Sequence, residues 1–219
     1  MKKFIISILL SAAFMAAPSV YSHAQSICKL KPTMTVLLYP EGQEAENGLQ
    51  EALGPKLSNG ITGPEWSDET GRIGSISDSA RVDIYLPKKC NGQMIVVCPG
   101  GGYRYVSALK EGLHVADWMT ARGIAVAVVK HRMPEGHWEI PVIDVQNAFR
   151  YCRAHAAEWG VDQIGVMGFS AGGHLAGTTS TLWTEQQTRP DFSILIYPVI
   201  TMEVGFTHRG TREKLITEK

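Results

Sequence analysis

Gly168-Phe169-Ser170-Ala171-Gly172-Gly173-His174 is the stretch of sequence that decides the fold. It follows an apolar run, residues 164–167, that is typical of a buried strand, and it opens a stretch of small residues compatible with a helix. A Gly-x-Ser-x-Gly sequence between a strand and a helix predicts a tight turn, in which the serine takes a strained backbone conformation and its neighbours have no room for bulk. We therefore expect the hydroxyl of Ser170 to stand exposed at the carboxyl edge of a sheet, as a nucleophile.

Short, nearly continuous apolar runs recur on both sides of this turn. They predict parallel strands covered on both faces at residues 94–98, 124–129, 164–167 and 192–197. Helical periodicity lies between them, at residues 109–120, 142–159 and 170–181. Residues 33–39 and 81–86 predict two earlier strands, and residues 40–80 between them predict a long surface connection. Strands that alternate with helices predict an α/β fold with a doubly wound, mostly parallel sheet.

A glycine loop, Cys98-Pro99-Gly100-Gly101-Gly102-Tyr103, follows the strand predicted at 94–98. Acyl transfer creates a negatively charged oxygen, and backbone N–H groups aimed at that oxygen stabilise it. Consecutive glycines allow such a close approach because they carry no Cβ. The predicted donors are the N–H groups of Gly101, Gly102 and Ala171. Tyr103 and Arg104 extend the loop and are predicted to bind substrate.

With these motifs in view, the chain resembles the bacterial acetyl xylan esterase and feruloyl-esterase-like branch of the α/β-hydrolase superfamily. The matching stretches are residues 97–103, Glu111-Gly112, Lys130-His131-Arg132, residues 168–176 and residues 197–200. The resemblance implies the α/β-hydrolase fold and a serine carboxylic-ester hydrolase that deacetylates xylan or related plant oligosaccharides, with Ser170 as the nucleophile. An acylated carbohydrate is then the substrate, and neither a metal nor an organic cofactor is needed. Glu111 is expected to tether the glycine loop or to cap a helix.

The sequence departs from this family pattern after the nucleophile. In α/β-hydrolases the triad acid and the histidine follow the serine along the chain. Here the strand at 192–197 corresponds to the sixth of the fold, and neither residue is identifiable before Lys219. We therefore expect an α/β-hydrolase domain over residues 25–219 that is incomplete at its C-terminus and lacks the last strands of the usual sheet. The resemblance implies a structural role for His174, beside the nucleophile. His208 follows the last predicted strand and could reach the cleft, but the chain order of the triad in this fold argues against it as the base.

Two other functions remain open. A prolyl-oligopeptidase-type peptidase shares the same turn, although no propeller-like domain fits in residues 25–80. A non-catalytic truncated remnant is the second, and the sequence beyond Lys219 would discriminate it from an esterase: an Asp and then a His in frame favour the esterase.

The first 24 residues are predicted to be a secretory signal peptide, which implies a secreted or periplasmic protein. Lys2 and Lys3 precede a short apolar run, and small residues at 22 and 24 favour cleavage before Gln25. The chain has 21 basic and 21 acidic residues and no basic block, which argues against nucleic acid and anionic membrane as partners. Oligomeric state is left open.

The four cysteines carry no zinc-binding pattern. Cys98 and Cys152 are predicted to be buried free thiols, because one ends an apolar strand and the other lies on an apolar helix stripe. Cys28 with Cys90 is the one pair considered for a disulfide.

Overall fold

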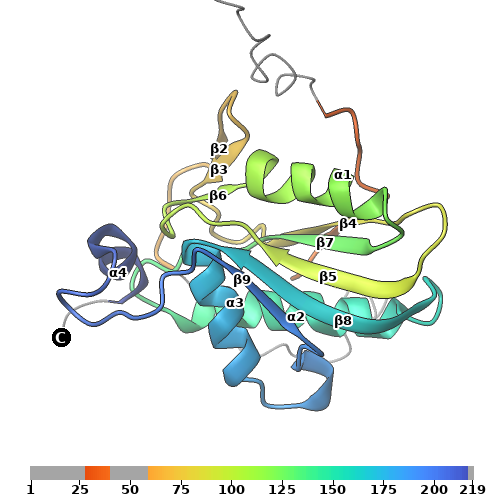
Figure 1. Cartoon of the computed structure of the whole chain (residues 1–219). Helices are drawn as coiled ribbons and strands as arrows, with labels where there is room; N and C mark the ends of the chain where they lie inside the picture. The colour runs from red at the N-terminus through yellow and green to blue at the C-terminus, as the bar shows by residue number, and fades with distance from the viewer. Residues whose placement is uncertain (1–27, 40–58, 217–219) are drawn as a thin grey trace, which may run out of the picture.

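The computed structural model describes residues 28–39 and 59–216 of the chain. The predicted signal peptide and residues 40–58 of the predicted connection lie outside the described residues. The described part is built on a six-stranded sheet (Figure 1). Its strands lie in the order β1 (Met34–Leu37), β4 (Arg81–Tyr85), β7 (Ala125–Lys130), β5 (Gly92–Cys98), β8 (Val161–Phe169) and β9 (Ser193–Ile196). The pairs β1–β4 and β4–β7 are antiparallel, and β7, β5, β8 and β9 run parallel.

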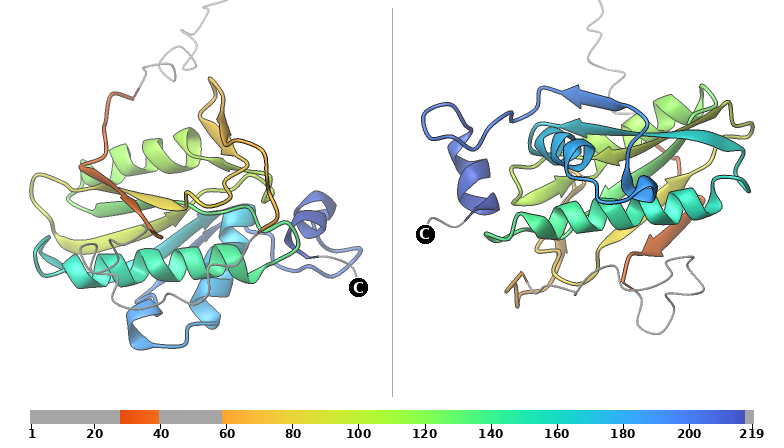
Figure 2. Two further views of the ribbon diagram at one scale, coloured as in Figure 1. Left: turned by 180° about the vertical axis from the view of Figure 1, so that it is seen from behind. Right: turned by 90° about the horizontal axis from the view of Figure 1, so that it is seen from below.

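Helices cover both faces of this sheet, which confirms the doubly wound architecture. α1 (His114–Thr120) lies on one face, and α2 (Glu139–His155) and α3 (Ala171–Thr181) lie on the other (Figures 1 and 2). The central strand β5 contributes side chains to the cores on both faces of the sheet. Ile95 and Val97 pack in the core under α1, whereas Met94 and Val96 pack in the core under α2 and α3. Burial of one such side chain contributes about 1.5–3 kcal/mol, so the apolar runs of the sequence account for the layers.

The longest helix follows its sequence signals closely. Pro141 lies in the first turn of α2, where a missing backbone N–H breaks no helical hydrogen bond. The chain leaves the helix and turns at Gly160, which has φ +66°, before β8 begins. The structure thus confirms residues 142–155 of the helix predicted at 142–159. α2 starts three residues earlier than predicted and ends at His155.

Several short elements were not expected from the sequence. β2 (Trp66–Ser67), β3 (Arg72–Gly74) and β6 (Tyr105–Ser107) form a second, antiparallel sheet, partly within the segment interpreted as a surface connection. Strands of two or three residues are too short to show an alternating pattern. A π-helical turn, η2 (Leu109–Leu113), precedes α1; a 3₁₀ turn, η3 (Gln186–Thr188), precedes β9; and α4 (Arg209–Leu215) lies beyond the end of the sheet.

The disulfide considered for Cys28 and Cys90 is not formed, because both are free thiols. The Sγ atom of Cys90 lies 3.7 Å from the carbonyl oxygen of Gln93, whereas Cys28 lies near Tyr85. Cys98 and Cys152 are buried and free, as predicted. Burial raises the pKa of the Cys152 thiol to about 12, which keeps it protonated and unreactive. None of the described helices combines the length and the apolar character that a membrane span requires.

Candidate active site

Ser170 occupies the sharp turn between β8 and α3 that the sequence predicts. Its backbone has φ +52° and ψ −118°, a conformation that residues other than glycine rarely adopt. The end of β9 and the segment that follows it hold Ser170 there. The N–H of Ser170 donates to the carbonyl oxygen of Ile196 (3.1 Å), and the N–H of Val199 donates to the carbonyl oxygen of Ser170 (3.0 Å). These contacts offset the backbone strain, which persists only where the surroundings fix it.

The two glycines of the motif are required by contacts with backbone atoms. A Cβ at Gly168 would lie 2.0 Å from the carbonyl oxygen of Gly172. A Cβ at Gly172 would lie 2.1 Å from the carbonyl oxygen of Cys98. Because backbone cannot move aside as the end of a side chain can, the start of α3 is pressed directly against the end of β5. The sharp turn at Ser170, hereafter the elbow, is therefore built by the close approach of three chain segments.

The glycine loop after β5 presents unpaired backbone donors. Gly101 and Gly102 have φ +140° and +62°, and a Cβ at Gly101 would lie 2.0 Å from the carbonyl oxygen of Tyr105. Neither of their N–H groups donates a hydrogen bond to another described residue. Ala171 stands at the first position of α3, where a backbone N–H has no acceptor within the helix. All three predicted donors thus have N–H groups without an acceptor in their own secondary structure.

Ser170 and the glycine loop line one open pocket of about 640 Å³. Its walls come from the glycine loop and β6, from η2, from the segment after β9, and from the start of α4. The residues that line it are Gly101, Gly102, Arg104, Tyr105, Ser107, Glu111, Ser170, Tyr197, Val199, His208, Gly210 and Thr211. Acidic and basic side chains, Glu111 and Arg104, face the same space as the serine, so the pocket is polar on the side of the glycine loop.

Tyr103 does not line this pocket, which corrects its expected role in substrate binding. Its backbone φ of +58° turns the ring into the core, where the side chain is 1 % exposed. The hydroxyl lies 3.0 Å from Nδ1 of His174, and the ring meets those of His131 and His174 edge-on. Burial raises the pKa of the Tyr103 phenol and lowers the pKa of both imidazoles. Arg104, the next residue, is exposed and lines the pocket.

Glu111 ties the glycine loop to the segment after β9. One carboxylate oxygen, Oε2, accepts the N–H of Gly100 at 2.6 Å, so the expected tether is present. The other, Oε1, accepts the hydroxyl of Tyr197 at 2.6 Å. Tyr197 lines the pocket and was missed as a site residue. The stretch 197–200 was singled out only as part of the family resemblance, and its own residue types carry no signal for a contact with Glu111.

His208 faces the pocket but is committed to capping α4. Its Nδ1 accepts the backbone N–H of Thr211 at 3.2 Å and lies 2.8 Å from the Thr211 hydroxyl. An imidazole nitrogen that accepts a hydrogen bond carries no proton, so the neutral ring holds its proton on Nε2. Nε2 is therefore a donor, whereas a general base needs a nitrogen that accepts the proton of the serine. No described residue makes a hydrogen bond with the hydroxyl of Ser170.

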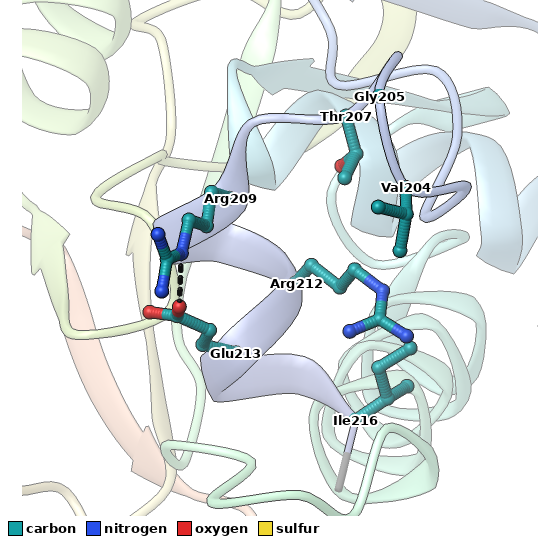
Figure 3. A pocket seen from close by; sticks show the side chains of 7 residues that line it. All are labelled: Val204, Gly205, Thr207, Arg209, Arg212, Glu213 and Ile216. Carbon is teal, nitrogen blue, oxygen red and sulfur yellow. Dashed lines mark hydrogen bonds and ion pairs between the residues drawn. The ribbon is translucent and has the colours of Figure 1, made fainter. Parts of the chain in front are cut away.

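A second pocket, of about 730 Å³, lies between the 204–207 segment and α4 (Figure 3). Arg209 and Glu213 form an ion pair on its rim, and Nε of Arg212 donates to the carbonyl oxygen of Met202. Val204 and Ile216 supply apolar walls. This pocket has neither a serine nor a cysteine among its lining residues, and we do not assign chemistry to it.

Comparison with known proteins agrees with this geometry. Residues 82–203, more than half of the chain, match the family described as BD-FAE. An acetylxylan esterase of Xylanibacter ruminicola is 42% identical over 139 residues, which cover 62% of this chain and 29% of that protein. The chain therefore corresponds to less than a third of the length of this curated relative.

Solved structures show the same fold. The acetyl ester-xyloside bifunctional hydrolase from Caldicellulosiruptor lactoaceticus superposes with a TM-score of 0.60 at 26% identity, over 87% of this chain and 66% of that chain. Thermogutta terrifontis esterase 2, in a structure phosphoramylated by tabun, superposes with a TM-score of 0.52 at 27% identity, over 64% of this chain and 58% of that chain. Fold, elbow and family match lead to one conclusion: the chain is an α/β-hydrolase and belongs to the BD-FAE family.

Proposed function

We propose that this chain carries the nucleophile and the oxyanion hole of a serine carboxylic-ester hydrolase that deacetylates xylan or related acylated oligosaccharides. One observation carries the proposal. The strained Ser170 and the unpaired N–H groups of Gly101 and Gly102 line the same open pocket. The similarity to an acetylxylan esterase and to an acetyl ester-xyloside hydrolase supports an acetylated carbohydrate as the substrate.

The proposed reaction has two steps. In the first, Oγ of Ser170 forms a bond to the acetyl carbonyl carbon, and the carbonyl oxygen becomes an oxyanion that the N–H groups of Gly101, Gly102 and Ala171 stabilise. The C–O bond to the sugar then breaks, and the sugar alcohol leaves with the proton that the serine gave up. In the second step, the oxygen of a water molecule forms a bond to the acyl carbon, the bond from that carbon to Oγ breaks, and a proton from the water returns to Oγ as acetate leaves. Each oxyanion donor contributes about 3–4 kcal/mol to lowering the barrier.

The base that takes the serine proton is proposed to lie outside the described residues. Nδ1 of His208 is engaged at the cap of α4, and His174 is bonded to Tyr103. His131 is buried with Nδ1 against the carbonyl oxygen of Arg132. The remaining described histidines, His114, His137 and His155, do not line the pocket of Ser170.

Substrate preference and the serine's role are tested together. A fluorophosphonate probe should label Ser170 in the full-length protein, and Ser170→Ala should lose both the labelling and the hydrolysis of acetylated xylo-oligosaccharides. Ser180→Ala is the matched control, because this residue lies on the same helix and its hydroxyl bonds to Ser193 outside the pocket. Faster hydrolysis of feruloyl esters than of acetyl esters would replace acetyl by feruloyl as the assigned acyl group. Faster hydrolysis of a peptide amide would favour the peptidase alternative. Absence of labelling in well-folded protein would leave only a non-catalytic role.

Export is a separate proposal. It rests on residues 1–24, and it predicts that the mature protein begins at Gln25. N-terminal sequencing of the protein recovered from its native source tests this directly. An intact Met1 in that material would contradict it.

A further inference from the structure

Glu111 stands where two parts of the pocket meet. Its two carboxylate oxygens bind residues that are far apart in the sequence, Gly100 in the glycine loop and Tyr197 after β9. Both contacts measure 2.6 Å. Hydrogen bonds to an ionised carboxylate are short and about twice as strong as neutral ones. A single side chain of η2 thus joins the loop that carries the predicted oxyanion donors to the segment that clamps the backbone of Ser170.

The contact with Gly100 fixes the loop against the nucleophile. A Cβ at Gly100 would lie 2.5 Å from the carbonyl oxygen of Phe169 and 3.1 Å from Cβ of Ser170, so this glycine is already packed against the elbow. Because Glu111 occupies the N–H of Gly100, that group is not available to an oxyanion. The N–H groups of the next two residues remain unpaired. Anchoring the first glycine therefore sets where the following two point.

The contact with Tyr197 fixes a second part of the pocket wall. This residue has φ +36°, a strained conformation, and its side chain is 62% exposed. Within the described residues, Glu111 is the hydrogen-bond partner of its hydroxyl. Partial burial, and then the bond to Glu111, raise the pKa of Tyr197 to about 12, so the phenol keeps its proton and donates it. The ring also has a tilted contact with the ring of Phe169.

We propose that Glu111 is a positioning residue for the esterase reaction, which holds both the glycine loop and Tyr197 in place in the pocket of Ser170. The proposal rests on the proposed function. The carboxylate touches no reacting atom in this assignment, and it acts through the backbone donors of Gly101 and Gly102 on one side and through the Tyr197 ring on the other. The barrier to acyl transfer then depends on Glu111, whereas substrate affinity depends chiefly on Tyr197.

Three variants separate these roles in the full-length protein. Glu111→Ala removes both contacts. Glu111→Gln keeps an oxygen for the N–H of Gly100 and an amide that donates to the Tyr197 oxygen. Tyr197→Phe removes only the second contact. Glu185→Gln is the matched control, because Glu185 is an exposed carboxylate paired with Arg150 and does not line the pocket.

The measurements are kcat and KM for an aryl acetate, the rate of Ser170 labelling by a fluorophosphonate, and the free energy of unfolding. Glu111→Ala should lower kcat and the labelling rate by about 100-fold, the effect of one misplaced oxyanion donor, and should raise KM about as much as Tyr197→Phe does, because both variants lose the contact with Tyr197. Glu111→Gln should recover kcat to within about tenfold of wild type. Tyr197→Phe should raise KM and change kcat little. Glu185→Gln should match wild type.

Two results overturn the proposal, and they differ from failure of the proposed function. If Glu111→Ala is labelled and turns over at the wild-type rate, or if it loses only stability, Glu111 does not position the loop. If kcat of Glu111→Gln is as low as that of Glu111→Ala, the hydrogen bond to the N–H of Gly100 does not account for the effect of Glu111 on the reaction. If wild-type protein is not labelled at Ser170, the esterase assignment itself is wrong, and the role of Glu111 falls with it.

Discussion

The hydroxyl of Tyr103 lies 3.0 Å from Nδ1 of His174, and this partly buried contact joins the glycine loop to the helix that follows the nucleophile. The loop is thus held at two places. Glu111 binds its first glycine from the side of η2, and His174 binds its last residue from the side of α3. A loop whose backbone must point at a developing charge needs such anchors, because glycine alone leaves it free to move.

Removing the Tyr103 hydroxyl should therefore destabilise the protein. Tyr103→Phe keeps the ring in the core but leaves the imidazole of His174 without this partner, and we expect the free energy of unfolding to fall by about 1–3 kcal/mol. Urea denaturation monitored by circular dichroism measures it. Tyr85→Phe is the control, since Tyr85 is also buried and no hydrogen bond of its hydroxyl is found among the described residues. Equal losses in the two variants would contradict the assignment.

Stability should also decline as the pH falls below about 6.5. Burial lowers the pKa of His131 and His174 below their usual value of 6.5. The unfolded chain then binds protons at these positions at a pH where the folded protein still keeps both rings neutral. The stabilising contribution is complete above about pH 6.5 and is lost as the pH falls through that value toward the folded pKa values.

Urea titrations at a series of pH values between 8 and 5.5 test this dependence. His174→Gln should flatten the decline, because it removes one of the two groups. His114→Gln should leave it unchanged, because His114 is exposed. A decline of equal steepness in His174→Gln would show that other groups govern it.

Substitution of an elbow glycine by alanine should cost far more stability than the same substitution at a glycine further along α3. In Gly172→Ala the new methyl would lie 2.1 Å from the carbonyl oxygen of Cys98, so β5 and α3 must separate. We expect the free energy of unfolding to fall by about 3 kcal/mol or more, and the labelling of Ser170 to be lost. At Gly177 the nearest atom is Cδ1 of Leu195 at 3.7 Å, an ordinary contact.

Gly177→Ala is therefore the matched control. It should raise the free energy of unfolding by up to about 1 kcal/mol, because alanine favours the helical state more than glycine does. Thermal unfolding and fluorophosphonate labelling of the two variants give both quantities. A Gly172→Ala variant as stable as this control would contradict the requirement for glycine at position 172.

How far the sequence predicted this structure depended on the length of each signal. The parallel strands and the elbow were predicted, because residues 94–98 and 164–167 are continuous apolar runs beside glycine-rich turns. The small sheet of β2, β3 and β6 was missed, because strands this short show no period. α4 was missed as well, because its seven residues are mostly polar.

The sequence predicted those parts of the site that are built from the local backbone. It did not predict contacts between side chains that are far apart in the sequence. Ser170 and the glycine loop carry their own local signals. Tyr103 was expected in the pocket because it follows the glycines, but a positive φ turns its ring into the core. The bond between Tyr197 and Glu111 joins residues 86 positions apart, and no pattern in either stretch indicates it.

The capping role of His208 predicts a definite proton position. Because Nδ1 accepts the N–H of Thr211, the neutral ring should carry its proton on Nε2. His155 is the internal control: its Nδ1 lies 2.9 Å from the carbonyl oxygen of Tyr151, a contact that requires the proton on Nδ1. Long-range ¹H–¹⁵N NMR spectra of ¹⁵N-histidine-labelled protein at pH 8 distinguish these two tautomers. The two rings should show opposite patterns, and His208→Ala should remove the signals assigned to the first. A proton on Nδ1 of His208 would free Nε2 to accept the proton of Ser170, and it would reopen this histidine as the base.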